Sequence, residues 1–242
     1  MRRRYICGAF VGVLVIAAAL SATAGGATPS MRHGPIHMRT NSTSTNWSGY
    51  AVTGGRYTSV SSSWTEPTVT CSGTTAYSSF WVGLDGDTSG TVEQTGTDAD
   101  CSGSTPQYYA WYEMYPKFPV NLKGTVKPGD HLSASVTTNG SGSFTLTITD
   151  STQGWTNQTN ARLKSAKLAS AEVIAEAPSS SGGVLPLANF GTVGFSGASA
   201  NGSLLTSSTP GIDAITMQSG STVKAQPSSI SNGSFTVTWK HS

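Results

Sequence analysis

The stretch over residues 81–96 is the first part of this sequence in which residue types and spacing suggest chemistry. It starts with an apolar, β-favouring run, passes through a turn rich in Gly, Asp and Ser, and then alternates again. Strand alternation places Trp81 and Asp85 on one face and separates Glu93 from Gln94 onto opposite faces. A large ring beside polar groups could bind a substrate, although a structural corner accounts for the same hairpin.

A second stretch with chemical potential is the predicted strand over residues 108–115. Its alternate positions place three aromatic rings and one carboxylate on the same face: Tyr109, Trp111, Glu113 and Tyr115. A carboxylate is costly to bury without a partner, so this face is expected to line a cleft or meet a partner. A half-exposed aromatic ladder with a surface Glu would show the same pattern.

A third stretch, over residues 170–178, places Glu172 and Glu176 on one face of an otherwise apolar predicted strand. Glu is depleted in strands, so a pair of them on one face needs a reason. Catalysis is one reason, and protection of an edge strand against aggregation is the other.

Several common hydrolase chemistries find no support in the sequence. Beyond residue 45 the only histidines are His131, after a turn, and His241, next to the last residue. A Ser-His-Asp or Cys-His site is therefore not expected, and neither Gly-x-Ser-x-Gly nor His-Glu-x-x-His occurs. Acid–base chemistry by carboxylates, with or without an amide, is the chemistry that remains.

The N-terminal sequence predicts secretion. A charged start, an apolar run and a small-residue exit are typical of a signal peptide over residues 1–24. Residues 25–44 have the composition of a leader or short propeptide, and residues 45–242 are long enough for one domain with its own core. No later segment could span a bilayer, so no membrane contact is expected after signal cleavage.

Charge and cysteine content narrow the function further. Charged residues make up 11% of the chain, the formal net charge is +2, and no basic patch predicts nucleic-acid binding. After loss of the signal peptide the cysteines are Cys71 and Cys101, which should form a disulfide outside the cell. Two cysteines without supporting histidines do not predict a metal site.

Short alternating runs separated by Gly, Asn and Ser turns predict an all-β, antiparallel sandwich. The turn over residues 139–142 is a strong hairpin signal, and only residues 161–171 could hold a helical turn. Strands are expected over residues 46–52, 58–65, 81–84, 91–95, 107–115, 131–138, 143–149, 170–176, 190–196, 211–218 and 234–240.

Several short motifs, in this order, resemble those of the glutamic peptidases, or eqolisins, and especially their bacterial secreted members. The resemblance runs from residue 46 to about residue 197. The matching segments are Asn-Trp-Ser-Gly-Tyr from Asn46, Trp-Val-Gly-Leu-Asp-Gly from Trp81, Gln-Thr-Gly from Gln94, Ala-Trp-Tyr-Glu-Met-Tyr-Pro from Ala110, Pro-Gly-Asp from Pro128 and Ser-Ala-Glu-Val-Ile-Ala-Glu-Ala-Pro from Ser170. The resemblance implies a concanavalin-like jelly roll of two large antiparallel sheets with a concave substrate cleft.

The resemblance also implies roles for individual residues. It implies that Gln94 and Glu176 form the catalytic dyad, which makes Glu93 a bystander. The residues that it implies for substrate binding are Trp81, Asp85, Trp111, Glu113 and Tyr115. It implies an acidic optimum, polypeptide substrates and no cofactor, and we expect a monomer. The chain departs from the family at Val173, where Trp is usual, and at Tyr109, where fungal members carry Asp.

Two other functions stay open on the sequence. A jelly-roll glycosidase would use Glu113 and Glu176 as acid and nucleophile, about 5–5.5 Å apart in a retaining enzyme, but it leaves Gln94 without a role. A non-catalytic carbohydrate-binding module would use the aromatic strand as a sugar platform.

Overall fold

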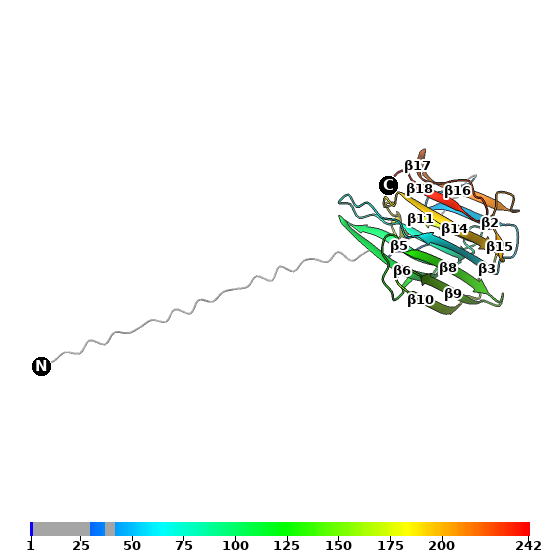
Figure 1. The fold of residues 1–242 in the computed structure, drawn as a ribbon, viewed down its shortest axis with the longest axis horizontal. Coiled ribbons are helices and arrows are strands. Elements are labelled where there is room, and N and C mark those ends of the chain that lie inside the picture. The colour runs from blue at the N-terminus through cyan, green and yellow to red at the C-terminus, as the bar shows by residue number, and fades with distance from the viewer. Residues whose placement is uncertain (2–29, 37–41) are drawn as a thin grey trace.

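The computed structural model describes Met1, residues 30–36 and residues 42–242 (Figure 1). All regular elements in these ranges are strands. Apart from Met1, the predicted signal peptide lies outside the described residues. Residues 30–36 and 42–44 of the predicted leader lie within them, and we keep the word leader for residues 25–44. No helix of the described ranges has the length and apolar character needed to cross a membrane.

Sixteen strands form one continuous hydrogen-bonded sheet. Along its main path lie β10 (Trp155–Arg162), β9 (Ser143–Asp150), β8 (His131–Thr138), β3 (Ser59–Thr65), β14 (Thr192–Ala200), β18 (Phe235–Trp239), β17 (Thr222–Pro227), β16 (Ile212–Ser219), β2 (Trp47–Thr53), β11 (Ser170–Glu176), β4 (Ser79–Leu84), β5 (Val92–Ser102), β6 (Thr105–Tyr115) and β7 (Val120–Asn121).

Four short strands complete the set. β1 (Thr43–Ser44) runs parallel to β16, and β15 (Ser203–Leu204) pairs with the end of β14. β12 (Ser179–Ser180) and β13 (Gly183–Val184) form a separate two-stranded sheet. The described strands therefore confirm the all-β prediction, with antiparallel pairing along the whole main path.

The prediction of two separate sheets is not what the hydrogen bonds show. β16 joins the halves, because residues 212–215 pair with β2 while residues 217–219 pair with β17. One strand thus changes neighbours partway along its length, and the ladder continues from one half of the fold into the other. The two halves still face each other: β4 packs against β3 and β8, and β11 packs against β3 and β14.

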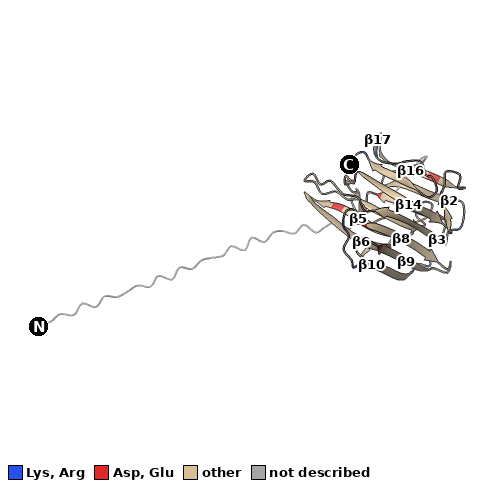
Figure 2. Ribbon diagram, viewed as in Figure 1, with Lys and Arg blue, Asp and Glu red and all other residues tan. Residues whose placement is uncertain are grey.

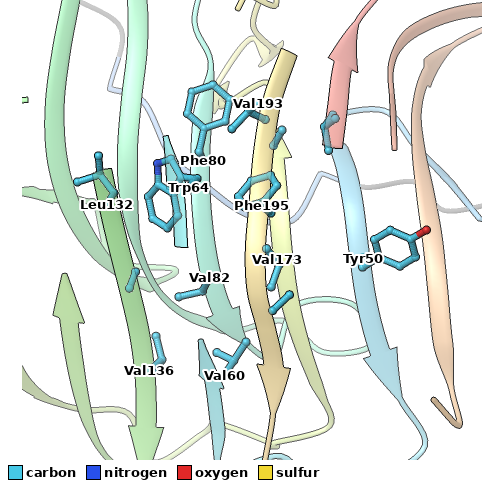
Figure 3. Close-up of a cluster of buried hydrophobic side chains, with 14 of the residues drawn as sticks. Tyr50, Val60, Trp64, Phe80, Val82, Leu132, Val136, Val173, Val193 and Phe195 are labelled. Carbon is cyan, nitrogen blue, oxygen red and sulfur yellow. The ribbon is translucent and has the colours of Figure 1, made fainter. Parts of the chain in front are cut away.

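The hydrophobic core lies between these two halves. Figure 3 shows side chains of β3, β8 and β14 meeting those of β4 and β11, including Trp64, Phe195, Phe80 and Val173. β8 and β9 alternate between buried and less buried positions, as strands with one solvent-facing side do. β4 and β11 are buried at every position, so their second face must also be covered.

A smaller aromatic cluster covers that second face. Its buried members are Trp47, Ala51, Trp81, Val92, Trp111, Ile174 and Ile215, with Tyr109 and Tyr115 packed against them. These side chains come from β2, β11, β4, β5, β6 and, through Ile215, β16. We call this surface the cleft face, because it carries the candidate site.

The predicted hairpin turn is present in the structure, whereas the one candidate helical turn is not. The turn over residues 139–142 does connect an antiparallel hairpin, β8 and β9. The segment 161–171 contains no helix, since β10 ends at Arg162 and β11 begins at Ser170. β10 was not predicted, because half-buried and exposed positions alternate along it and both sets contain polar residues. Its sequence therefore shows no fully apolar face.

The disulfide between Cys71 and Cys101 is present. It links the segment before β4 to the end of β5, two strands of the cleft face, across a sequence separation of 30. Charge is sparse over the rest of the fold, and most of the ribbon in Figure 2 carries neither acidic nor basic residues.

Candidate active site

Strand register brings Gln94 and Glu113 together on the cleft face. They are cross-strand partners on β5 and β6, and Gly83 on β4 lies opposite Gln94 on its other side. A Cβ atom at Gly83 would lie 2.9 Å from the Trp81 ring and 3.2 Å from Gln94 Cβ. A glycine at this position therefore leaves room for the Gln94 side chain.

Glu176 at the end of β11 contributes the second group of the predicted dyad. The Trp81 indole Nε1 donates to Glu176 Oε2 at 2.8 Å, and Asn46 Nδ2 donates to Oε1 at 3.0 Å. Both Gln94 and Glu176 are 0% exposed. Burial raises the pKa of Glu176 to about 8, while the positive charge of His33 and the donated hydrogen bonds act in the opposite direction.

A segment of the leader occupies the space between these two side chains. Gln94 Nε2 donates to the carbonyl oxygen of His33 at 2.7 Å. The next backbone N–H, of Gly34, donates to Glu176 Oε1 at 2.9 Å. The predicted dyad therefore holds a single peptide bond by both of its polar ends.

The His33 side chain fills a pocket of opposite charge. Its ring stacks on Trp111 with centroids 3.6 Å apart and planes 5° from parallel. Nδ1 lies 3.1 Å from Glu113 Oε2, and Nε2 lies 3.2 Å from a carboxylate oxygen of Asp98. Burial alone lowers the pKa of His33, but the charges and hydrogen bonds of Asp98 and Glu113 outweigh it and raise that pKa to about 10.

Asp98 was not predicted as a site residue. It accepts hydrogen bonds from Trp111 Nε1 at 2.6 Å and from the Tyr109 hydroxyl at 2.8 Å, and Tyr109 also donates to Asp100 at 2.8 Å. Burial, then the charge of Asp98, raise the pKa of Asp100 well above its usual range. Strand alternation could have identified Asp98, because Asp98 and Asp100 lie at even spacing from Gln94 and so share its face. They were missed because the strand was expected to end at residue 95.

Arg32 anchors the leader on the side before His33. Its backbone forms an antiparallel bridge with Ser179, with N–H···O distances of 2.8 and 2.9 Å. Its guanidinium donates to the carbonyl oxygen of Pro116 at 2.8 Å and lies 4.0 Å from the centroid of the Phe118 ring. Backbone and side-chain contacts therefore both hold this residue.

Asp85 does not join the cleft face, contrary to the expectation from strand alternation. β4 ends at Leu84, and Asp85 has a φ of 67°, so the alternation stops there. Its carboxylate accepts three backbone hydrogen bonds at 2.8 Å, from Lys167, Leu168 and Ala169. Asp85 therefore anchors the loop before β11.

Glu93 lies on the face opposite Gln94, as predicted. Burial, followed by the charge of Asp85, raises the pKa of the Glu93 carboxyl to about 9. Tyr115 does lie near the leader, since a Cβ atom on Gly34 would be 3.4 Å from its ring. The structure thus brings together Gln94, Glu176, Trp81, Trp111, Glu113 and Tyr115, and leaves out Asp85.

These contacts define the class of site. It is a β-sheet face on which a side-chain amide and a carboxylate hydrogen-bond to the two polar ends of one peptide bond. The chain belongs to the Peptidase A4 family, whose model matches residues 45–239. This membership confirms the family to which the sequence motifs pointed.

Two fungal proteins show sequence similarity to parts of the chain. Aspergillopepsin-2 from Aspergillus niger is 33% identical over 124 residues, 49% of this chain and 44% of the relative. Scytalidopepsin B from Scytalidium lignicola is 40% identical over 75 residues, 30% of this chain and 28% of the relative. The chain spans less than half the length of these curated relatives.

Solved structures match more of the fold. Scytalido-glutamic peptidase, solved with a transition state analog inhibitor, has a TM-score of 0.72 and 26% identity, covering 81% of this chain and 98% of that chain. Aspergilloglutamic peptidase from Aspergillus niger has a TM-score of 0.61 and 28% identity, covering 68% and 99%.

Proposed function

We propose that the protein is a secreted endopeptidase that hydrolyses peptide bonds with Glu176 and Gln94 as its catalytic dyad. One observation carries the proposal: the carbonyl oxygen of His33 accepts a hydrogen bond from Gln94 at 2.7 Å, while the following N–H donates to Glu176 at 2.9 Å. The acyl oxygen and the leaving nitrogen of one peptide bond thus each contact one member of the dyad.

The mechanism uses water, a base and an oxyanion donor. Glu176, as carboxylate, removes a proton from water, whose oxygen attacks the peptide carbonyl carbon. The Gln94 amide donates to the oxygen on which negative charge develops, and losing such a donor typically costs about 10²–10³ in rate. Glu176 then returns the proton to the leaving nitrogen, which already lies within hydrogen-bonding distance of Oε1.

The base must be ionised to begin this cycle. Burial is the largest cause of the raised pKa of Glu176. With the leader bound, a pKa of about 8 leaves a fraction of the Glu176 carboxyl ionised near neutral pH. Departure of the leader would return water to the carboxyl and lower its pKa, which extends the ionised form into mildly acidic solution. An acidic optimum is therefore compatible with the site.

The surrounding residues position the reactants. Trp81 and Asn46 hold the Glu176 carboxylate by donating to different oxygens, at 2.8 and 3.0 Å. Trp111 and Glu113 contact His33, and the Tyr115 ring lies beside Gly34. We infer that these three residues line the cleft for polypeptide substrates as well. No cofactor takes part in any step, and the proposed working unit is a monomer.

Secretion and origin belong to the same proposal. The N-terminal sequence supports a signal peptide over residues 1–24, a leader over residues 25–44 and a peptidase domain over residues 45–242. The Cys71–Cys101 disulfide supports folding in an oxidising compartment. The sequence motifs support the bacterial secreted branch of the family, and the facing halves of the sheet support its concanavalin-like sandwich.

The glycosidase alternative is less well supported by the same contacts. It gives no role to Gln94, although Gln94 is the side chain that contacts the peptide carbonyl. The bound segment is a polypeptide, which favours a peptidase over a sugar-binding module.

Cleavage of denatured casein in acidic buffer tests the proposal, with xylan as the competing substrate. Glu176→Gln and Gln94→Ala should abolish casein cleavage without unfolding the protein. The matched controls are Glu93→Gln, on the opposite face of β5, and Gln158→Ala, exposed on β10; both should retain activity. Full activity of Glu176→Gln, or cleavage of xylan alone, would overturn the proposal.

A further inference from the structure

We propose that the protein cleaves its own chain between His33 and Gly34, and that the pocket around His33 selects a protonated imidazole before the scissile bond. This inference rests on the proposed function, because it takes Gln94 and Glu176 as the cleaving groups. It adds a substrate, the leader, and a side-chain preference at the position before the scissile bond.

The peptide bond between His33 and Gly34 lies between Gln94 and Glu176. Among the described leader residues, the bond between His33 and Gly34 is the one whose carbonyl oxygen and N–H contact Gln94 and Glu176. Gly34 has a φ of +112°, a conformation that side-chain-bearing residues rarely adopt. An added Cβ would also lie 3.3 Å from Val92 and 3.4 Å from Gln94 Nε2. The site therefore accepts glycine after the scissile bond in this conformation.

The pocket around the His33 side chain matches a protonated imidazole. It offers a carboxylate to each ring nitrogen and an aromatic face to the ring plane, through Asp98, Glu113 and Trp111. The backbone N–H of His33 also donates to Glu113, at 2.8 Å. A protonated imidazole satisfies both carboxylates at once, whereas an apolar side chain would leave two buried acids without a cationic partner.

The leader is held on both sides of the His33–Gly34 bond. Arg32 bridges to Ser179 on one side. On the other side, Ser42 accepts a hydrogen bond from Thr216 N–H at 2.9 Å, and Asn46 contacts Glu176 directly. A segment tethered at both ends reaches the dyad intramolecularly, at a high effective concentration.

The reaction is an ordinary hydrolysis that consumes one water molecule. The water oxygen bonds to the carbonyl carbon of His33 while the C–N bond to Gly34 breaks. One proton from water passes through Glu176 to the nitrogen of Gly34, which becomes a new N-terminus. The other proton is released when the new carboxyl group of His33 ionises.

The uncut leader also blocks the site. Gln94, Glu176 and Trp111 are all 0% exposed with the leader in place. Another polypeptide cannot reach the dyad until residues 32–34 leave. Cleavage at His33 is therefore the step that converts a blocked precursor into an active peptidase.

The test uses the full chain, refolded from denaturant and followed by intact mass and N-terminal sequencing, with casein cleavage measured in parallel. The wild type should acquire an N-terminus at Gly34, with a half-time unchanged over a roughly 100-fold dilution. Glu176→Gln should retain the bond. His33→Leu should cut it at least about tenfold more slowly, while the matched control His37→Leu should behave as wild type.

Each remaining outcome has a definite meaning. Casein cleavage by a wild-type chain whose His33–Gly34 bond stays intact overturns the self-cleavage proposal and leaves the proposed function standing. Cutting of this bond in Glu176→Gln assigns it to another protease and also overturns the proposal. A chain that cuts neither casein nor itself overturns both. Equal rates for His33→Leu and wild type overturn the imidazole pocket.

Discussion

Trp81 and Glu176 are coupled by a buried hydrogen bond, in which the indole Nε1 donates to Oε2 at 2.8 Å. The two residues come from adjacent strands, β4 and β11, whose register places Trp81 opposite Ile174. The indole therefore orients the carboxylate that we propose as the base, and it contributes to holding down a pKa that burial raises.

Removal of this donor by Trp81→Phe should lower kcat by about 10- to 100-fold with the fold retained. Because the indole hydrogen bond lowers the pKa of Glu176, its loss should also shift the acidic limb of the kcat/KM profile toward higher pH. Kinetics across pH check this, with Trp239→Phe on β18 as control. An unchanged profile with an unchanged kcat would contradict the positioning role.

Asp85 should matter for stability and not for chemistry. Asp85→Asn keeps one acceptor oxygen but replaces the other with an NH2 donor, which would face backbone N–H groups that now donate to the carboxylate. We expect a loss of about 2–4 kcal/mol in the free energy of unfolding, with kcat/KM per folded molecule unchanged. Denaturant unfolding and active-site-normalised kinetics measure the two quantities. A large loss of kcat/KM at unchanged stability would return Asp85 to the substrate site.

His33 in the bound leader should remain protonated well above neutral pH. Its pKa rises from 6.5 to about 10, so its contribution to leader binding is complete below pH 6.5 and is lost as pH rises through 10. The groups around it are Asp98 and Asp100 on β5, Glu113 on β6, Glu176 on β11 and Arg32 in the leader.

An NMR titration of the His33 imidazole in Gln94→Ala measures this pKa, because the substitution blocks cleavage and removes no charge. His241, which is exposed, supplies an internal reference in the same sample. Titration of His33 near 6.5 would show that the leader does not occupy the carboxylate pocket.

The disulfide should contribute to stability across the cleft face. Replacing Cys71 and Cys101 by Ala should lower the free energy of unfolding by roughly 3–4 kcal/mol, as the loop-entropy model gives for a closed loop of this length. Cys101 shares β5 with Gln94 but lies at the other end of that strand, and Glu176 lies on β11. The folded variant should therefore still cleave casein. Equal stability of the variant and wild type would contradict this estimate.

Much of the site could be predicted because its residues lie in regular strands. Gln94, Trp111, Glu113 and Glu176 keep the alternation that their sequences show. The position of Asp85 could not be predicted in this way, because strand alternation fails at a residue with positive φ just past the end of the strand. The continuous hydrogen-bonded ladder was not predicted either, because no residue pattern marks the point at which β16 stops pairing with β2 and begins pairing with β17.

The contacts of the leader could not be predicted from the sequence for a different reason. A segment such as residues 30–36 has no apolar periodicity and takes its conformation from the cleft that binds it. At Tyr109, where fungal members carry Asp, the hydroxyl donates to both Asp98 and Asp100. Val173 lies on the face of β11 opposite Glu176 and is fully buried in the main core.

The most direct test of the central claim is kcat/KM for a synthetic peptide covering residues 30–36, measured by mass spectrometry on leader-free protein. Wild type should cut this peptide between His33 and Gly34, and Glu176→Gln should fall by at least about 10⁴-fold, as expected for loss of the group that both activates water and protonates the leaving nitrogen. A Glu176→Gln variant within tenfold of wild type would contradict the assignment of Glu176 as the catalytic acid–base.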